Sequence, residues 1–334
     1  MKVLLTKKFQ KTDIEYIRDK LSDDIELIEP AEFTEEGVVS SITDAHVLLG
    51  GMLTESVLKA SGHIKLFQIP WTGVDSINFE LLKKYNIDCV CNSHSNASIV
   101  AEHAITLYGA VAKKIAYHDS QMRAGNWNRV SPKGNTVSPF SQAMFEKNIM
   151  LLGYGAVNRF VHSMLSGFKP RITVVNRSGG VKDIESTIEK VFPCADIMEA
   201  VPHADVIFVA VPLTEQTKLF FNKACFSAMK QNAILINVAR GAVIDEESLY
   251  NVLHRKNIYG AGIDTWYNYP AQTGGSTFPS KKFPFHELEN LVMSPHRAGY
   301  IDSGFPHLDD AILNLHNVQM SKPLLNRVSI DQLY

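Results

Sequence analysis

The sequence predicts an α/β protein with two doubly wound domains, each a parallel sheet covered by helices on both faces. Three observations lead to this prediction. Short apolar runs alternate with amphipathic stretches, many of the runs are unbroken Val, Ile and Leu, and a second series begins near the middle of the chain. Unbroken apolar strands are buried on both faces, which is typical of parallel sheets. A length of 334 residues also favours two domains over one.

The first series occupies the N-terminal part of the chain. Its apolar runs predict strands, and the stretches between them carry apolar residues at helical spacing. The predicted strands are residues 2–6, 25–29, 46–51, 65–70 and 87–92, and the predicted helices are residues 12–21, 55–60 and 78–85.

A long helical pattern over residues 98–125 separates the two series, and a second helical pattern covers residues 302–322 near the end of the chain. The second series has longer apolar runs than the first. Each of its runs predicts a strand with the turn that follows it, in the stretches 148–155, 171–177, 205–212, 233–239, 259–265 and 290–295.

The composition favours a soluble globular protein over a nucleic-acid or membrane binder. Apolar residues make up 45% and charged residues 20%, and the formal net charge of −2 gives no reason to expect an anionic partner. The N-terminal apolar run, VLL, is too short for a signal peptide, and no segment is long enough to cross a membrane. The four cysteines lack a CxxC spacing. We therefore expect reduced thiols, no metal ion and a cytoplasmic location.

The stretch LLGYGAVNRF follows a predicted strand and opens a predicted helix. Gly153 would allow a tight turn, and Gly155 would let the backbone approach a pyrophosphate at the helix N-terminus, beside Ala156 and Val157. The third position of the GxGxxG pattern holds Asn158, which predicts a looser contact between helix and strand. The stretch predicts a dinucleotide site; the alternative is an ordinary strand-to-helix turn.

The following strand ends in TVVNRSGG. An NAD-preferring site usually carries Asp or Glu at this point, where it bonds the adenosine ribose hydroxyls. This chain has Asn176, Arg177 and Ser178 instead. Arg177 would attract a 2′-phosphate and Ser178 could donate a hydrogen bond to it, so we expect NADP to be preferred over NAD. The alternative is that Arg177 is only solvated.

Two candidate catalytic residues follow buried strands of the second series. Arg240 comes directly after the run ILINVA, and His296 follows the run LVMSP. The carboxyl ends of parallel strands are where open α/β sheets bind ligands. A guanidinium there can grip a carboxylate with two parallel hydrogen bonds, and an imidazole at a second strand end is a candidate acid and base.

The chain carries a series of motifs that covers almost its whole length: VAEHA (100–104), GNW (125–127), GYGAVNR (153–159), VAVPLTEQT (209–217), INVARGAVIDEESL (236–249), GAGID (260–264) and SPHRAG (294–299). In this order the motifs resemble the D-isomer-specific 2-hydroxyacid dehydrogenases. The resemblance implies a nicotinamide cofactor and a small 2-oxo or D-2-hydroxy acid as substrate.

The resemblance also implies the domain plan. A discontinuous, flavodoxin-like substrate domain would be formed by residues 1–98 and 302–334, with a Rossmann cofactor domain, residues 99–301, inserted between its parts. The active site would lie in the cleft between the two domains. The protein would be a homodimer, with the long segment after VAEHA as its dimerisation arm.

Site roles follow from the resemblance, residue by residue. Arg240 would hold the carboxylate and the 2-oxo group of the substrate, and His296 would exchange a proton with the substrate oxygen. Asp264 would bond the nicotinamide carboxamide. The cofactor cleft would be lined by Val211 and Pro212, with Val238 and Ala239 beneath the nicotinamide. Backbone amides would complete the carboxylate pocket at Gly51, Met52, Thr72 and Gly73; the alternative is that these four belong only to turns.

The segment DTWYNYP, residues 264–270, departs from the family pattern. In most of the family a glutamate precedes the proline and bonds the catalytic histidine, whereas this chain has Tyr269 there. A phenol can orient the imidazole but supplies no negative charge, so His296 should titrate lower than beside a carboxylate. Three interpretations stay open: Tyr269 substitutes for the acid, another acid such as Glu287 reaches His296, or turnover is reduced or changed in kind.

Three side chains near this segment have two interpretations each. Trp266 and Tyr267 are expected to pack in the core, as aromatic residues after a strand usually do, but could line the site. Arg297 could bind a second anionic group of the substrate, or could face solvent.

The main prediction is an NAD(P)-dependent D-2-hydroxyacid dehydrogenase. The first alternative is a catalytically weakened relative that senses the cofactor or binds a partner. A second is a dehydrogenase for an anion that needs no proton transfer, such as formate or phosphite.

Overall fold

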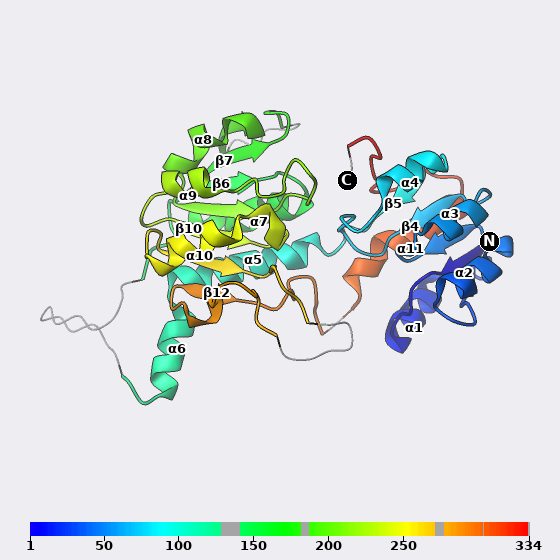
Figure 1. Ribbon diagram of the computed structural model, residues 1–334, viewed down its shortest axis with the longest axis horizontal. Helices are drawn as coiled ribbons and strands as arrows, with labels where there is room; N and C mark the ends of the chain where they lie inside the picture. The colour runs from blue at the N-terminus through cyan, green and yellow to red at the C-terminus, as the bar shows by residue number, and fades with distance from the viewer. Residues whose placement is uncertain (128–140, 182–186, 271–276, 303, 333–334) are drawn as a thin grey trace, which may run out of the picture. The chain divides into compact units, whose positions relative to one another are not determined.

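The computed structural model describes residues 1–127, 141–181, 187–270, 277–302 and 304–332. The chain divides into two compact units (Figure 1): unit 1 is Met1–Asn96 with Ile301–Tyr334, and unit 2 is Ala97–Tyr300. Each unit is built on one parallel sheet. The predicted α/β fold with two doubly wound domains is confirmed.

The sheet of unit 1 has the order β2-β1-β3-β4-β5 among the described residues. Its parallel strands are β1 (Lys2–Leu5), β2 (Glu26–Ile28), β3 (Val47–Leu49), β4 (Leu66–Gln68) and β5 (Val90–Cys91). One face packs on α2 (Glu35–Ser41), α3 (Glu55–Ala60) and α4 (Phe79–Lys84). The other face packs on α1 (Lys11–Lys20) and α11 (Pro306–Gln319).

The sheet of unit 2 has the order β12-β11-β10-β9-β6-β7-β8 among the described residues. Its parallel strands are β6 (Asn148–Leu152), β7 (Arg171–Asn176), β8 (Ile188–Pro193), β9 (Val206–Val209), β10 (Ile234–Asn237), β11 (Gly260–Ile263) and β12 (Leu291–Met293). The strand order reverses between β6 and β9, and ligands of doubly wound sheets bind at the carboxyl ends of strands beside such a reversal.

Helices cover both faces of this second sheet. The helices α5 (Ala97–Ala112) and α7 (Ala156–Leu165) pack on one face. The helices α8 (Ile197–Ala200), α9 (Lys223–Ala228) and α10 (Glu246–His254) pack on the other. The strands are therefore buried from both sides, which accounts for their unbroken apolar sequences.

Side-chain caps explain where several helices begin. Thr34, Thr54, Asn78, Asn222 and Asp245 each precede a helix and accept a hydrogen bond from a backbone N–H of its first turn. Such caps satisfy donors that have no partner inside the helix and are worth about 1 kcal/mol each.

The predicted long helix over residues 98–125 is divided in two. Lys114 has a left-handed backbone (φ +52°) and separates α5 from α6 (Ile115–Arg123). In Figure 1, α6 extends away from the sheet of unit 2, and none of its residues is buried. The break arises because a residue in the left-handed region cannot continue a right-handed helix.

The strand β8 was not among the predicted strands. It lies at the edge of its sheet and exposes Glu189 and Lys190, so it lacks the apolar run of the central strands. The last predicted helix begins at Pro306, four residues later than expected, because proline is favoured in the first helical turn.

All four cysteines are free thiols. Burial raises the pKa of each, and that of Cys91 to about 12. Within the described parts of the chain, the helices are all too short or too polar to cross a membrane.

Candidate active site

The predicted phosphate loop, residues 153–155, follows β6 and opens α7. Gly153 has a positive φ of +85°, and a Cβ built there would lie 2.5 Å from the carbonyl oxygen of Ala210. Gly155 precedes α7 without a side-chain cap, and apart from its two chain neighbours none of the described residues has an atom within 4 Å of its Cβ position. The first N–H groups of α7, beginning at Ala156 and Val157, lack acceptors inside the helix, and the open space at Gly155 leaves room for a diphosphate to approach them.

Asn158 does not loosen the contact between α7 and the sheet, contrary to the prediction. Its side chain is 1% exposed, and its amide nitrogen donates to the carbonyl oxygens of Gly153 at 2.7 Å and Leu152 at 3.2 Å. The amide thus bonds the helix to the end of β6, where a glycine would offer only close packing.

The end of β7 forms a tight turn around Asn176. The Asn176 amide nitrogen donates to the Gly180 carbonyl at 2.7 Å, and its oxygen accepts from the Gly179 N–H at 2.8 Å. Asn176 therefore has a structural part in the turn. Arg177 and Ser178 are both exposed at its surface, where a cofactor phosphate could reach them.

Two more loops at the carboxyl edge adjoin the phosphate loop. Val211 follows β9, and its Cγ1 would lie 2.8 Å from a Cβ on Gly153. Pro212 comes next, and its carbonyl accepts a hydrogen bond from the Thr217 hydroxyl at 2.6 Å. Val238 and Ala239 follow β10, the neighbouring strand. The predicted cofactor-lining residues therefore lie on adjacent strand ends.

Arg240 lies just beyond β10 and is partly buried. Asn237 braces the turn before it, because its side chain accepts from the Ala239 N–H at 3.0 Å and donates to the Arg240 carbonyl at 3.2 Å. The chain then passes close to the next loop: a Cβ on Gly241 would lie 2.3 Å from the carbonyl oxygen of Trp266. Glycine is required here for that close approach.

Asp264 joins the ends of β10, β11 and β12. Its N–H donates to the Asn237 carbonyl at 3.0 Å, and its carbonyl accepts from the His296 N–H at 2.8 Å. Its carboxylate is 1% exposed and accepts from the N–H groups of Arg297 at 2.9 Å and Ala298 at 3.1 Å. Arg240 and His296 therefore belong to one edge of the sheet, on either side of Asp264.

His296 is exposed and has a left-handed backbone with φ of +55°. Residues other than glycine rarely adopt this conformation, which costs about 1–3 kcal/mol and is common at functional sites. The Asp264 contacts supply the bonds that hold the loop in it. The Arg297 guanidinium lies 5.9 Å from the ring centre of Tyr300.

The DTWYNYP segment divides into core and surface residues. Trp266 is buried, and its indole N–H donates to the Ser294 carbonyl at 2.8 Å. The Tyr267 hydroxyl donates to the Ile244 carbonyl at 3.1 Å, and burial raises its pKa. Both pack against Phe285.

Tyr269, by contrast, is 46% exposed, and its ring centre lies 5.6 Å from that of His296. Its phenol oxygen accepts from the Trp266 N–H at 3.0 Å. The tyrosine is therefore beside the imidazole, where the resemblance predicts it. The side chain of Glu287, the alternative acid, is 68% exposed and lies 3.9 Å from His286.

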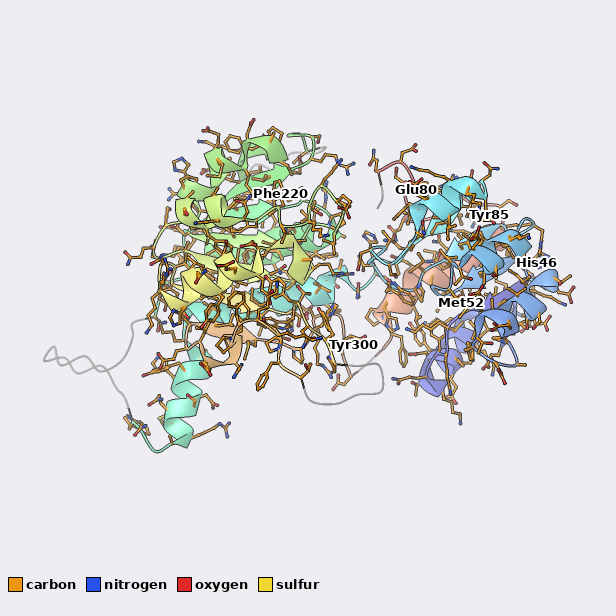
Figure 2. All side chains as sticks on the ribbon, viewed as in Figure 1. His46, Met52, Glu80, Tyr85, Phe220 and Tyr300 are labelled. Carbon is orange, nitrogen blue, oxygen red and sulfur yellow. The ribbon has the colours of Figure 1, made fainter. Side chains whose placement is uncertain are left out.

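Two loops of unit 1 meet at the carboxyl ends of β3 and β4. Gly51 lies against the indole of Trp71: a Cβ on Gly51 would lie 2.6 Å from Cζ2 of the indole. Met52, labelled in Figure 2, is the next residue. Thr72 precedes Gly73 and donates from its hydroxyl to the Ser93 carbonyl at 2.9 Å. Because β3 and β4 are neighbours, the four predicted residues lie on adjacent loops.

Two residues that the sequence analysis did not single out contribute to these edges. Lys7 follows β1 in unit 1, with its ammonium 4.7 Å from the ring centre of Trp71, and burial lowers its pKa. In unit 2, the His103 imidazole lies 3.0 Å from the Ser294 hydroxyl. The available signals were a lysine after an apolar strand and a histidine inside the VAEHA motif, but neither pattern alone indicates a site.

The comparison with protein families is decisive for the enzyme class. The model of the D-isomer specific 2-hydroxyacid dehydrogenase NAD binding domain matches residues 105–298. The chain belongs to this family. It is an oxidoreductase of the NAD(P)-dependent D-2-hydroxyacid dehydrogenase class, as predicted. The comparisons do not support the alternative of a cofactor-sensing protein.

Three similar proteins are named as reductases or dehydrogenases. The glyoxylate reductase of Thermococcus onnurineus is 26% identical, over 88% of this chain and 85% of that protein. A D-3-phosphoglycerate dehydrogenase of Methanocaldococcus jannaschii is 27% identical, over 89% of this chain but only 53% of that protein. An acyclic imino acid reductase solved with NADPH and D-Arg has a TM-score of 0.76 at 25% identity, with 98% of this chain and 100% of that chain covered.

Proposed function

We propose that the protein reduces a small 2-oxo acid to its D-2-hydroxy acid, with unit 2 as the cofactor domain and unit 1 as the substrate domain. The observation that supports this proposal is the grouping of Arg240, Asp264 and His296 at three neighbouring strand ends. Neighbouring strands are about 4.8 Å apart, so β10 and β12 are separated by about 10 Å. An acid bound over β11 lies between the guanidinium and the imidazole.

Each of these residues has a defined task in the reaction. Arg240 binds the substrate carboxylate through parallel N–H donors and polarises the carbonyl at C2. A reduced nicotinamide, when bound, would supply the hydride that C2 receives. His296 donates a proton to the oxygen at C2 as negative charge develops there, and it takes up the same proton in the reverse reaction.

Asp264 has capacity left for the carboxamide of the nicotinamide. Its two carboxylate oxygens accept two backbone hydrogen bonds, and an ionised carboxylate has about four acceptor positions. The backbone at Gly51, Met52, Thr72 and Gly73 supplies further donors for the substrate carboxylate in this proposal.

The preferred cofactor is NADP. The exposed Arg177 and Ser178 follow the strand at which an NAD site would have a carboxylate, and Asn176 is used inside the turn. A 2′-phosphate would therefore meet a guanidinium and a hydroxyl where an NAD site has a carboxylate.

A homodimer in the cytoplasm completes the proposal. The helix α6 has no buried residue and exposes Ile115 and Met122. An isolated helix that leaves apolar side chains in water is suited to a second copy of the chain. The rest of the predicted arm, residues 128–140, lies outside the described residues.

The test is to incubate the protein with a panel of 2-oxo acids and either NADPH or NADH. Turnover is measured as the loss of absorbance of the reduced nicotinamide. The variant His296→Asn is well suited, because asparagine tolerates a positive φ and should keep the loop conformation. We expect it to lower kcat by about 100-fold or more, as for loss of a general acid. His203→Asn, at an exposed histidine of the same unit, is the matched control.

The proposal fails if no 2-oxo acid is reduced with either cofactor. Oxidation of formate or phosphite without reduction of any 2-oxo acid would also overturn it.

A further inference from the structure

We propose that His103 is a positioning residue for the reaction, which fixes the loop of His296 through Asp264 and Ser294. The inference rests on the proposed role of His296 as the proton donor. It adds a residue from helix α5 to a site otherwise built from strand ends.

Helix α5 is aligned with β11 by two glycines. A Cβ on Gly260 would lie 3.0 Å from Cγ1 of Val111, and one on Gly262 would lie 2.9 Å from Cβ of Leu107. The absence of these Cβ atoms lets the helix approach the strand closely.

This alignment continues to the active-site edge. Four residues of a helix advance about 6 Å, and two residues of a strand about 6.6 Å, so the two spacings match. One turn before Leu107 is His103, and two residues beyond Gly262 is Asp264. The register of helix against strand therefore brings the imidazole to the carboxylate.

The contacts of the imidazole agree with this register. The His103 Nε2 atom lies 3.0 Å from the Ser294 hydroxyl and 3.5 Å from Oδ1 of Asp264. The imidazole is 28% exposed, whereas the Asp264 side chain is 1% exposed. His103 thus lies beside the buried carboxylate and bonds the residue two positions before His296.

The two partners of His103, Ser294 and Asp264, hold the backbone before and after His296. Ser294 precedes it, and its carbonyl accepts from the Trp266 indole at 2.8 Å. Asp264 bonds the N–H groups of the two residues after it. Between these points the backbone of His296 has a φ of +55°. This conformation is unfavourable for a residue other than glycine, so it depends on the contacts that hold the chain on both sides.

A positioning role predicts a specific kinetic pattern. In His103→Leu the Ser294 hydroxyl and the Asp264 carboxylate lose a polar partner, and His296 is free to move from its proton-transfer position. Displacements of about 1 Å cost up to about 100-fold in rate, so we expect kcat to fall by about 10- to 100-fold. The KM for the 2-oxo acid should change by less than about threefold, because Arg240 is untouched.

Conservative and matched variants separate positioning from general damage. His103→Gln places an amide nitrogen near the position of Nε2 and should restore most of kcat. In His103→Asn the side chain is too short to reach Ser294, so this variant should behave like His103→Leu. It serves as the test if the leucine variant does not fold. His203→Leu is the control for a histidine lost from the same unit.

Amide hydrogen exchange measures the loop independently of catalysis. Exchange across residues 294–300 should be at least about tenfold faster in His103→Leu than in the wild type, and close to the wild type in His103→Gln. This readout remains valid if no 2-oxo acid is turned over, so failure of the proposed function is distinguishable from failure of this inference. Unchanged exchange, an unchanged kcat, equal losses in the glutamine and leucine variants, or a loss confined to KM would each overturn it.

Discussion

Replacing Tyr269 by glutamate should change the pH dependence of the reaction in a predictable direction. A carboxylate beside His296 favours the imidazolium and raises the pKa of the imidazole. Reduction needs the protonated histidine, so it is lost as pH rises through that pKa. The alkaline limb for reduction should therefore move to higher pH in Tyr269→Glu, and the acidic limb for oxidation should move the same way.

The size of this shift follows from the geometry. The two rings are 5.6 Å apart, and Tyr269 is 46% exposed. At this separation two charges interact by about 3 kcal/mol at a dielectric constant of about 20 and by about 0.7 kcal/mol in bulk water. A half-exposed pair lies near the lower figure, about 1 kcal/mol, which corresponds to about 0.7 pKa units.

The matched control is Tyr269→Gln, which has the shape of glutamate without its charge. Both variants lose the bond from the Trp266 N–H to the phenol oxygen, so this loss cancels in the comparison. The assay is the pH profile of kcat/KM for reduction, measured for both variants over the same buffers. Superimposable profiles would refute the placement of residue 269 beside the proton donor.

Three other predictions follow from positions described above. Gly153→Ala should lower the melting temperature and weaken NADPH binding in a fluorescence titration, because the added Cβ would lie 2.5 Å from the Ala210 carbonyl oxygen. Gly155→Ala has open space at its Cβ and should keep the melting temperature of the wild type. Equal losses of melting temperature in the two variants would contradict this prediction. Arg177→Asp should weaken NADPH binding by at least about tenfold and leave NADH binding the same or tighter, as measured by direct titration of both cofactors. Cys91, which is 0% exposed with a pKa of about 12, should resist iodoacetamide at about pH 8 in the native protein and react after unfolding; native labelling detected by mass spectrometry would disagree with its burial.

Much of the fold could be predicted from apolar periodicity, because nearly every central strand is buried on both faces. The edge strand β8 was missed because its exposed positions carry Glu189 and Lys190, which interrupt the apolar run. The break at Lys114 was missed because neither glycine nor proline marks it.

The candidate site was predictable where strand ends define it. Arg240 and His296 follow apolar runs, so the parallel topology alone places them at one edge. His103 could not be found in this way. Its contact with Ser294 joins residues 191 positions apart and depends on how closely a helix approaches β11, which no local pattern specifies.

The position of α11 has a consequence for the order in which the chain folds during synthesis. Leu308 and Leu315 of this helix belong to the same buried apolar cluster as Val3 and Leu5 of β1, although they leave the ribosome more than 300 residues later. Unit 2 is contiguous and can complete its sheet first. Until α11 is made, α1 alone covers that face of the N-terminal strands, so the apolar residues that α11 would cover stay exposed in nascent unit 1.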